Sequence, residues 1–366
     1  MSTIAAVAPV LPGPAYAQEE IAAELGSVLV ADDAGRTLLE RLHRGTGIRT
    51  RHLALPLDRY RDLRTFTAAN DVFIERGAEL AEAAARRALD AAGLVPADVD
   101  YLLFTSVTGI SAPSLDALLV GRLGLRPDVK RLPSFGLGCV GGAAGLARVH
   151  DYLVGHPDDV ALLVSVELCS LTLQHDDPST ANLVASGLFG DGASGVVVLG
   201  RDRAARWARE AGPAALAAPE VVDTRSRLYP DSEAELGWQV GSGGFRIVLS
   251  PRLPDVIERH LGDDVAAFLY PHGLKAGDVG TWVAHAGGPK ILEATARSLD
   301  LAPGSLDVSW DCLARCGNLS SSSVLHVLAA TLDARTALPG TDGVLLAFGP
   351  GVSAELVLLR WPQEVA

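Results

Sequence analysis

The chain has 366 residues, 48% of them hydrophobic, and a net charge of −13 from 31 basic and 44 acidic residues. This length and composition allow two domains or one large duplicated one, and they exclude a disordered chain. The acidic balance lacks any basic block and so disfavours nucleic-acid binding, because phosphate contacts need clustered Lys and Arg.

The hydrophobic pattern predicts alternating helices and buried strands behind an extended lead-in over residues 1–17. Expected helices are 18–30, 36–44, 71–92, 115–123, the stretch after Cys139, 254–261, 289–299 and 321–332. Expected strands are 48–55, 99–107, 160–166, 193–199, 245–248, 281–284 and a closing hairpin of 343–348 with 354–359. Residues 202–219 are expected to connect two halves, 1–212 and 213–366. The alternation predicts an α/β fold in layers, with sheets covered on both faces.

The N-terminus contains Ala15-Tyr16-Ala17, which is similar to a signal-peptidase site. However, no Lys or Arg precedes it, and prolines interrupt the apolar stretch. No uncharged apolar run reaches the length of a membrane span. Four cysteines are too few for a disulfide framework in so long a chain, and these features together indicate a cytoplasmic protein.

Cys139 is the first candidate for a reactive group, because it lies in a glycine-rich turn ahead of a good helix-forming stretch. In that position backbone N–H groups and the positive end of the helix dipole favour the thiolate, which is the nucleophilic form. The alternative is a small cysteine packed in a tight turn, which is the commoner role. Cys312 and Cys316 could suggest a metal site, but no second Cys/His pair at ligand spacing accompanies them, so we expect them to pack and expect no metal.

The same glycine-rich stretch matches G-x-G-x-x-G from Gly136 to Gly141, a pattern typical of dinucleotide-binding loops. Residues 128–134 ahead of it are charged and contain Pro133, so they are expected to make a poor buried parallel strand. An NAD-dependent oxidoreductase is therefore an alternative hypothesis of a different class.

Two further residues have side chains suited to acyl chemistry. His285 ends an expected strand and precedes Ala-Gly-Gly-Pro, which would expose the imidazole to a cleft, although a lone histidine is more often structural. Asn318 lies in Gly-Asn-Leu-Ser, where a turn or helix-cap role is ordinary. With Cys139 they would supply a nucleophile, a base or oxyanion donor, and an amide donor.

In this combination and order, the motifs resemble those of type III polyketide synthases, the chalcone synthase superfamily, over roughly residues 35–360. The matching stretches are Gly138-Cys139, Leu188-Phe-Gly-Asp-Gly192, Trp282-Val-Ala-His285-Ala-Gly-Gly-Pro289, Gly317-Asn318-Leu-Ser320-Ser and Phe348-Gly349-Pro350-Gly351. The resemblance implies a thiolase-like αβαβα fold of two pseudo-duplicated halves and a homodimer. It also implies an acyl-CoA starter and malonyl-CoA as substrates, with no further cofactor.

The resemblance assigns roles to three residues. Cys139 would carry the starter as a thioester, while His285 and Asn318 would bind the carbonyl of malonyl-CoA and stabilise the enolate formed on loss of CO₂. Two donors aimed at one developing oxyanion typically contribute ~3 kcal/mol each. His285 would also help to keep Cys139 ionised. Repeated condensation and cyclisation would give a resorcinol, a pyrone or a polyhydroxylated aromatic.

Other positions match the family's cavity. Phe189 matches a residue that gates the cavity near the CoA tunnel, and Phe245 is similar to its partner. Gly349-Pro350-Gly351 matches the loop that shapes the cyclisation pocket, and Ser320 a position behind the cysteine. Small or polar residues near cavity-lining positions are expected to leave room for a long acyl starter; Ala112 among them replaces a methionine that plant enzymes carry across the dimer interface. They are Val107, Thr108, Ala112, Cys169 and Thr172.

The CoA-binding residues are less complete than in plant members. Arg41 aligns with a family arginine for the CoA phosphates and Arg44 is a nearby candidate, but Leu38 and Gly45 stand where chalcone synthases have further basic residues. The adjacent pair Gly287 and Gly288 is also assigned to CoA binding.

Within the same fold, the rival is ketoacyl-ACP synthase III, which uses the same Cys-His-Asn trio. The Gly287-Gly288-Pro289 and Phe348–Gly351 motifs argue against it. A catalytically silent acyl-binding relative is disfavoured, because all three reactive positions are filled.

Overall fold

The computed structural model describes residues 1–175, 177–212, 218–335 and 337–363. The strands of its main sheet are β1 (Ser2–Val10), β4 (Tyr101–Thr105), β5 (Lys130–Ser134), β6 (Val160–Leu168), β7 (Asp191–Gly200), β8 (Glu220–Leu228), β11 (Thr281–Ala284), β12 (Asp342–Gly349) and β13 (Ser353–Arg360). They are arranged in the order β11-β12-β13-β8-β1-β7-β6-β4-β5. Two small ribbons pair β2 (Ala15–Ala17) with β3 (Thr50–His52), and β9 (Leu236–Gly241) with β10 (Gly244–Leu249).

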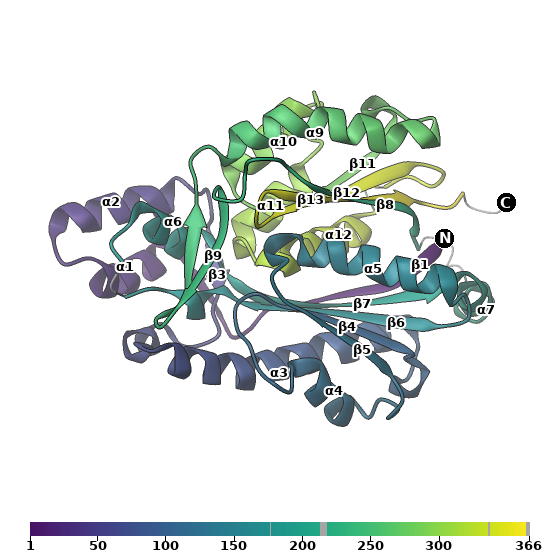
Figure 1. Cartoon of the computed structure of the whole chain (residues 1–366), viewed down its shortest axis with the longest axis horizontal. Helices are drawn as coiled ribbons and strands as arrows, with labels where there is room; N and C mark the ends of the chain where they lie inside the picture. The colour runs from purple at the N-terminus through teal and green to yellow at the C-terminus, as the bar shows by residue number, and fades with distance from the viewer. Residues whose placement is uncertain (176, 213–217, 336, 364–366) are drawn as a thin grey trace.

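Helices cover both outer faces of the sheet and also fill the space between its two layers of strands. They are α1 (Gln18–Leu29), α2 (Asp33–Arg44), α3 (Phe66–Ala92), α4 (Leu115–Leu123), α5 (Gly141–Gly155), α6 (Thr180–Leu188), α7 (Arg201–Ala211), α9 (Leu253–Leu269), α10 (Pro289–Ser298), α11 (Asp307–Cys316) and α12 (Ser323–Ala334). Figure 1 shows α9 and α10 on one outer side, α3 and α4 on the other, and α5 with α12 between two layers of strands. The layers meet where β1 and β8 share only a short antiparallel pairing, at Ser2–Val221 and Thr3–Glu220. The expected αβαβα arrangement is confirmed.

The two central helices begin side by side, and this places the site. Both are buried along most of their length, because their sequences are small and apolar almost all round. A Cβ on Gly142, near the start of α5, would lie 2.2 Å from the carbonyl oxygen of Ser321, so only glycine permits this approach. The short 3₁₀ turns ahead of the two helices, η3 (Gly138–Val140) and η7 (Ser320–Ser322), are therefore neighbours.

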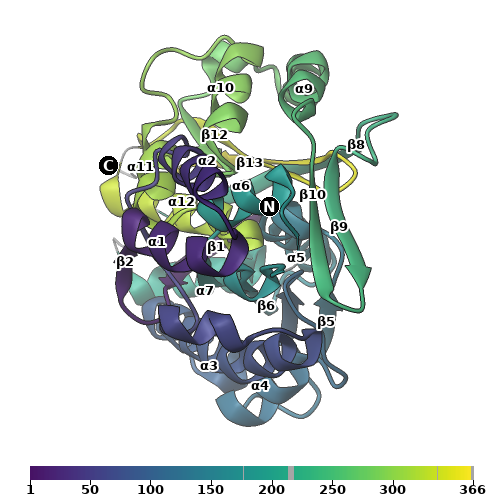
Figure 2. The same cartoon turned by 90° about the vertical axis from the view of Figure 1, so that its left-hand side faces the viewer.

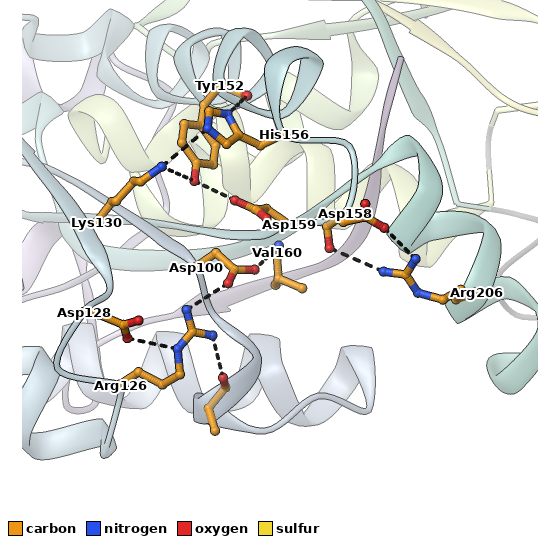
Figure 3. Close-up of polar contacts among 11 residues, drawn as sticks. Asp100, Arg126, Asp128, Lys130, Tyr152, His156, Asp158, Asp159, Val160 and Arg206 are labelled. Atoms are coloured by element: carbon orange, nitrogen blue, oxygen red, sulfur yellow. Dashed lines mark hydrogen bonds and ion pairs between the residues drawn. The ribbon is translucent and has the colours of Figure 1, made fainter.

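At the other end of the sheet, polar side chains join the starts of three parallel strands (Figure 3). Asp100, just before β4, accepts a hydrogen bond from the backbone N–H of Val160 on β6 at 2.8 Å and another from Arg126 at 2.9 Å. Its carbonyl accepts from the N–H of Lys130 on β5 at 3.0 Å. These contacts fix the starts of β4, β5 and β6, whose far ends lead toward the site.

Several sequence-based expectations about elements need correction. Residues 2–10 are a strand between β8 and β7 rather than a lead-in, and alternate side chains are buried. Residues 130–134 do form a parallel strand, but at the exposed edge, where Pro133 costs no ladder hydrogen bond. The connection over 202–219 contains α7, because its Ala-rich first part forms a helix. β2, α6, β8, β9 and α11 were not expected.

One further expectation is confirmed, and another falls next to residues outside the described part of the chain. Cys312 and Cys316 are buried free thiols, as the packing hypothesis predicted. The expected boundary between halves falls next to residues 213–217, which are outside the described residues. Among the described helices, none combines the length and apolar character needed to cross a membrane.

Candidate active site

Cys139 occupies the turn η3, directly before α5. Gly138 ahead of it adopts a φ of +55°, and a Cβ there would lie 2.5 Å from a ring carbon of Pro350, so a side chain could not be accommodated. The Cys139 thiol is partly buried and donates a hydrogen bond to the hydroxyl oxygen of Ser320, with Sγ and Oγ 3.6 Å apart. The Gly349-Pro350-Gly351 turn therefore packs against the nucleophile's own turn.

Asn318 follows α11 and is held by both its backbone and its side chain. Its N–H donates to the carbonyl of Leu188, its carbonyl accepts from the N–H of Gly190, and these bonds form a small bridge to Phe189. Its Nδ2 donates to the carbonyl of Gly287 at 3.1 Å, and its Oδ1 accepts from the N–H of Ser320 at 2.8 Å. The amide orientation is thus fixed by two opposite partners.

His285 comes directly after β11, where its N–H donates to the carbonyl of Leu346 on β12. The ring packs against Gly287: a Cβ there would lie 3.0 Å from Cδ2 and 3.2 Å from Nε2. The side chain is buried, and Nδ1 has no hydrogen-bond partner among the described residues. Because Gly287 contacts the His285 ring and accepts from Asn318, these two catalytic candidates meet at one glycine.

A buried carboxylate that the sequence analysis overlooked lies behind the cysteine. Glu167, near the end of β6, is fully buried. One of its oxygens accepts from the hydroxyls of Ser320 and Ser321, at the start of the second central helix. The other oxygen accepts from residues that follow β4, namely Ser106, Val107 and Thr108.

Burial shifts the pKa of each reactive group toward the neutral form. It raises the pKa of the Cys139 thiol to about 12, with Ser320 opposing the shift and Glu167 adding to it. It lowers the pKa of His285 to about 4. The thiolate–imidazolium pair expected from the sequence is therefore disfavoured in this arrangement. The thiol donates its hydrogen bond to Ser320 rather than to His285.

A small cavity of about 30 Å³ lies beside Phe189. Cys169 and Thr172 line it, as do Trp238 on β9 and Ile247 on β10, two residues that the sequence analysis did not single out. This volume holds about two water molecules.

The remaining candidates are distributed unevenly around the site. Phe245 is buried, but its ring packs on Phe66, Phe135 and Trp238 rather than directly on Phe189, with Trp238 contacting both. Thr108 is buried in the Glu167 network rather than beside the small cavity, and Ala112 is exposed in a loop outside the cavity's lining.

The candidates for CoA binding lie on two elements. Arg41 and Arg44 are exposed near the end of α2, and Gly287 and Gly288 precede α10. α2 packs on α6 through a hydrogen bond between His43 and Ser186 at 3.0 Å.

Two of the three glycines that suggested the dinucleotide hypothesis do not support it. Gly138 is covered by Pro350, while a Cβ on Gly141 would lie 2.7 Å from the hydroxyl of Thr105 and 3.0 Å from Cβ of Ser321. These glycines permit close packing within the protein, so their backbone has no free approach for a pyrophosphate.

Comparison with known proteins identifies a single family along the chain. The family model for chalcone and stilbene synthases matches with its N-terminal domain at residues 1–203 and its C-terminal domain at 220–362. A 1,3,6,8-tetrahydroxynaphthalene synthase from Streptomyces peucetius subsp. caesius is 54% identical over 98% of this chain and 93% of its own length.

Two solved structures are similar over nearly the whole fold. The 1,3,6,8-tetrahydroxynaphthalene synthase of Streptomyces coelicolor A3(2), described as a bacterial type III polyketide synthase, has a TM-score of 0.90 at 31% identity, with 98% of this chain and 99% of that chain covered. PKS-I from the brown alga Ectocarpus siliculosus also has a TM-score of 0.90, at 27% identity and 98% coverage of both chains. These similarities give no support to the oxidoreductase or the ketoacyl-ACP synthase alternative.

Replacing Glu167 by Gln tests the buried network. The NH₂ of the Gln amide would face hydroxyl or N–H groups that now donate to the carboxylate. We therefore expect the free energy of unfolding to fall by about 2 kcal/mol. Glu355→Gln is the matched control, because Glu355 is also buried but accepts one recorded hydrogen bond, from Ser226. Urea unfolding should show the smaller loss for the control; equal losses would contradict the role given to the Glu167 network.

Proposed function

The chain belongs to the chalcone and stilbene synthase family and is a type III polyketide synthase, and on that premise we propose that it makes a polyhydroxylated naphthalene from malonyl-CoA alone. The observation that carries this choice is the similarity of nearly the whole chain to a 1,3,6,8-tetrahydroxynaphthalene synthase. Trp238 and Ile247 line a small cavity of about 30 Å³ beside Phe189, and we assign to them the limit on starter size. The relative at 54% identity supports the naphthalene product.

In the proposed mechanism Cys139 attacks the starter thioester, and its proton passes to the imidazole of His285 and then to the departing CoA thiolate. His285 is neutral at pH 7, since burial lowers its pKa to about 4, so it can accept that proton. Malonyl-CoA then binds with its thioester carbonyl toward His285 and Asn318. An N–H from each residue stabilises the enolate that forms when CO₂ leaves.

The enolate carbon then attacks the acyl thioester, forming a C–C bond and releasing the Cys139 thiolate. Return of the lengthened chain from CoA to Cys139 starts the next cycle. Phe189 is held over this centre by its bridge to Asn318, where its ring would exclude water from the enolate. CoA thioesters are the substrates in this mechanism, and none of its steps needs a metal or redox cofactor.

We further propose that the enzyme is a homodimer that pairs through the exposed edge of the sheet. β5 is an edge strand, and three apolar side chains near it are exposed: Leu132 by 43%, Ile110 by 45% and Phe135 by 53%. An unpaired edge beside such a patch favours association with a second copy. A reducing, cytoplasmic setting is proposed as well, supported by four free thiols.

Malonyl-CoA supplied without any other starter should be converted to a tetrahydroxynaphthalene, detected by mass spectrometry. Cys139→Ala should reduce the rate of chain extension by at least about 10³-fold, because the acyl carrier is lost. Cys312→Ala, a buried thiol of α11, is the control and should retain activity. An unchanged rate in Cys139→Ala, or a strict need for a separate acyl-CoA starter, would refute the proposal.

Trp238→Ala should open the pocket beside Phe189 and broaden the choice of starter. Removing the indole frees enough volume for a medium acyl chain, so we expect octanoyl-CoA to be extended about tenfold faster than by the wild type. Val240→Ala, an exposed residue of the same strand, is the control. Competition assays with malonyl-CoA measure the shift, and unchanged selectivity would show that Trp238 does not close the pocket.

In solution, light scattering should give about twice the chain mass of 38.1 kDa. Leu132→Asp combined with Phe135→Asp places two charges on the proposed interface and should give monomers. Tyr270→Asp serves as the control, since Tyr270 is 83% exposed on the C-terminal half. A monomeric wild type, or a dimer that survives the double substitution, would contradict pairing through this edge.

A further inference from the structure

A groove of about 860 Å³ lies between the two halves of the chain. It is bounded by the end of β1, β3 and α3 on one side and by α11 and α12 on the other. Cys139, His285 and Asn318 do not line it, and it shares no lining residue with the small cavity beside Phe189. Small-molecule sites commonly have volumes of ~300–1,000 Å³, so the groove is large enough for a bicyclic ligand.

Two imidazoles in the groove each keep one nitrogen that can accept a hydrogen bond. In His326 of α12, Nε2 lies 3.0 Å from the carbonyl oxygen of Ala193, so Nε2 carries the hydrogen and Nδ1 is the acceptor. In His52 of β3, Nδ1 lies 3.1 Å from the carbonyl oxygens of Pro12 and Gly13, so Nε2 is the acceptor of the neutral ring. Neither acceptor nitrogen has a hydrogen-bond partner among the described residues.

Charged groups share the groove with these rings. Arg87 of α3 and Arg315 of α11 are exposed donors, and Asp333 of α12 is an exposed acceptor. Neither Arg87 nor Asp333 makes a hydrogen bond or ion pair with another described residue, whereas Arg315 forms an ion pair within α11. Burial lowers the pKa of His326 to about 4, with His52 and Arg315 contributing, so this imidazole is a neutral acceptor at pH 7.

This mixture of groups favours a ligand that both donates and accepts hydrogen bonds. A carboxylate or sulfonate ligand could bind the guanidinium groups, but it has no hydrogen to donate to the imidazoles and would be repelled by Asp333. A hydroxyl group can donate to an imidazole or a carboxylate and can accept from a guanidinium. Arginine also stacks on aromatic faces, and Leu11, Ala329 and Ala330 supply apolar walls.

We infer that this groove is a second binding site, for a polyhydroxylated aromatic molecule whose hydroxyl groups donate to His52 and His326. The groups of the groove define this ligand class, whereas the identity of the ligand with the enzyme's own product rests on the proposed function. A product bound there would leave the catalytic residues free, because none of them lines the groove. Figure 2 shows α11 and β2, the partner of β3, on the side of the molecule opposite β5, so pairing through the β5 edge leaves the groove accessible.

Isothermal titration calorimetry with three naphthalenes tests the site. 1,6-Dihydroxynaphthalene carries the hydroxyl groups, 1,6-dimethoxynaphthalene keeps the rings without hydrogen-bond donors, and naphthalene-1,5-disulfonate carries anionic groups instead. The dihydroxy compound should bind at least about tenfold more tightly than either of the others. Equal binding of the dimethoxy compound would overturn the inference, and so would equal or tighter binding of the disulfonate, which would indicate a site for anions.

Two variants locate the bound ligand. His326→Phe keeps a ring and removes the acceptor, so it should weaken binding of the dihydroxy compound at least about tenfold. Arg87→Ala should weaken it about fivefold through loss of the stacked cation, and this exposed position decides the test if the buried substitution prevents folding. Arg259→Ala on α9 is the matched control, because Arg259 is also exposed and makes no hydrogen bond or ion pair with a described residue.

Arg87→Ala and Arg259→Ala should both keep the wild-type kcat/KM for malonyl-CoA, since neither residue belongs to the catalytic site. Unchanged binding in Arg87→Ala would overturn the inference, because the ligand would then lie elsewhere. Binding of the dihydroxy compound does not depend on turnover. A wild type that binds it in this groove but does not convert malonyl-CoA would therefore refute the proposed function and uphold the binding site.

Discussion

The carboxylate of Glu167 is buried at the point where the two halves of the chain meet, and it is tolerable there only because donors from both halves converge on it. Residues after β4 occupy one oxygen, and Ser320 with Ser321 occupy the other. Ser320 is held in a left-handed conformation, with a φ of 49°, that is costly for a residue with a side chain. The network therefore maintains the strained turn that presents Ser320 to the Cys139 thiol.

A second set of contacts joins Phe189, the proposed gate, to the amide of Asn318. Phe189 and Asn318 form a backbone bridge, and the buried guanidinium of Arg51 donates to the carbonyl of Phe189 at 2.6 Å and to Gln18 at 2.9 Å. Asp191 lies close by, and burial raises its pKa to about 6 although Arg51 opposes the shift. Because Phe189 itself forms the backbone bridge to Asn318, a displacement of Phe189 would disturb the Asn318 amide.

The site residues that stand in short sequence motifs could be predicted from the sequence. Cys139, His285 and Asn318 stand in short motifs. The strand before His285 and the helices after Cys139 and Asn318 were predicted with small errors in length, whereas α11 ahead of Asn318 was not expected. Glu167 was missed because its role comes from donors 59 to 154 residues away in the chain, which no local pattern brings together. Trp238 was missed because its stretch forms a separate ribbon, so whether its ring fills the pocket depends on how that ribbon packs. β1 was read as a lead-in, since prolines at its end concealed an alternating buried strand.

In the proposed mechanism, the neutrality of His285 would let one imidazole serve two steps. An imidazolium could donate to the enolate oxygen but could not accept the thiol proton during loading, whereas a neutral ring can do each in turn. Burial favours that neutral form, with a pKa of about 4. Nδ1 has no recorded partner in the described structure, so no second hydrogen bond fixes the tautomer. A metal-binding or triad histidine usually has such a partner, and its absence here suits a ring that must exchange the positions of proton and lone pair between loading and decarboxylation.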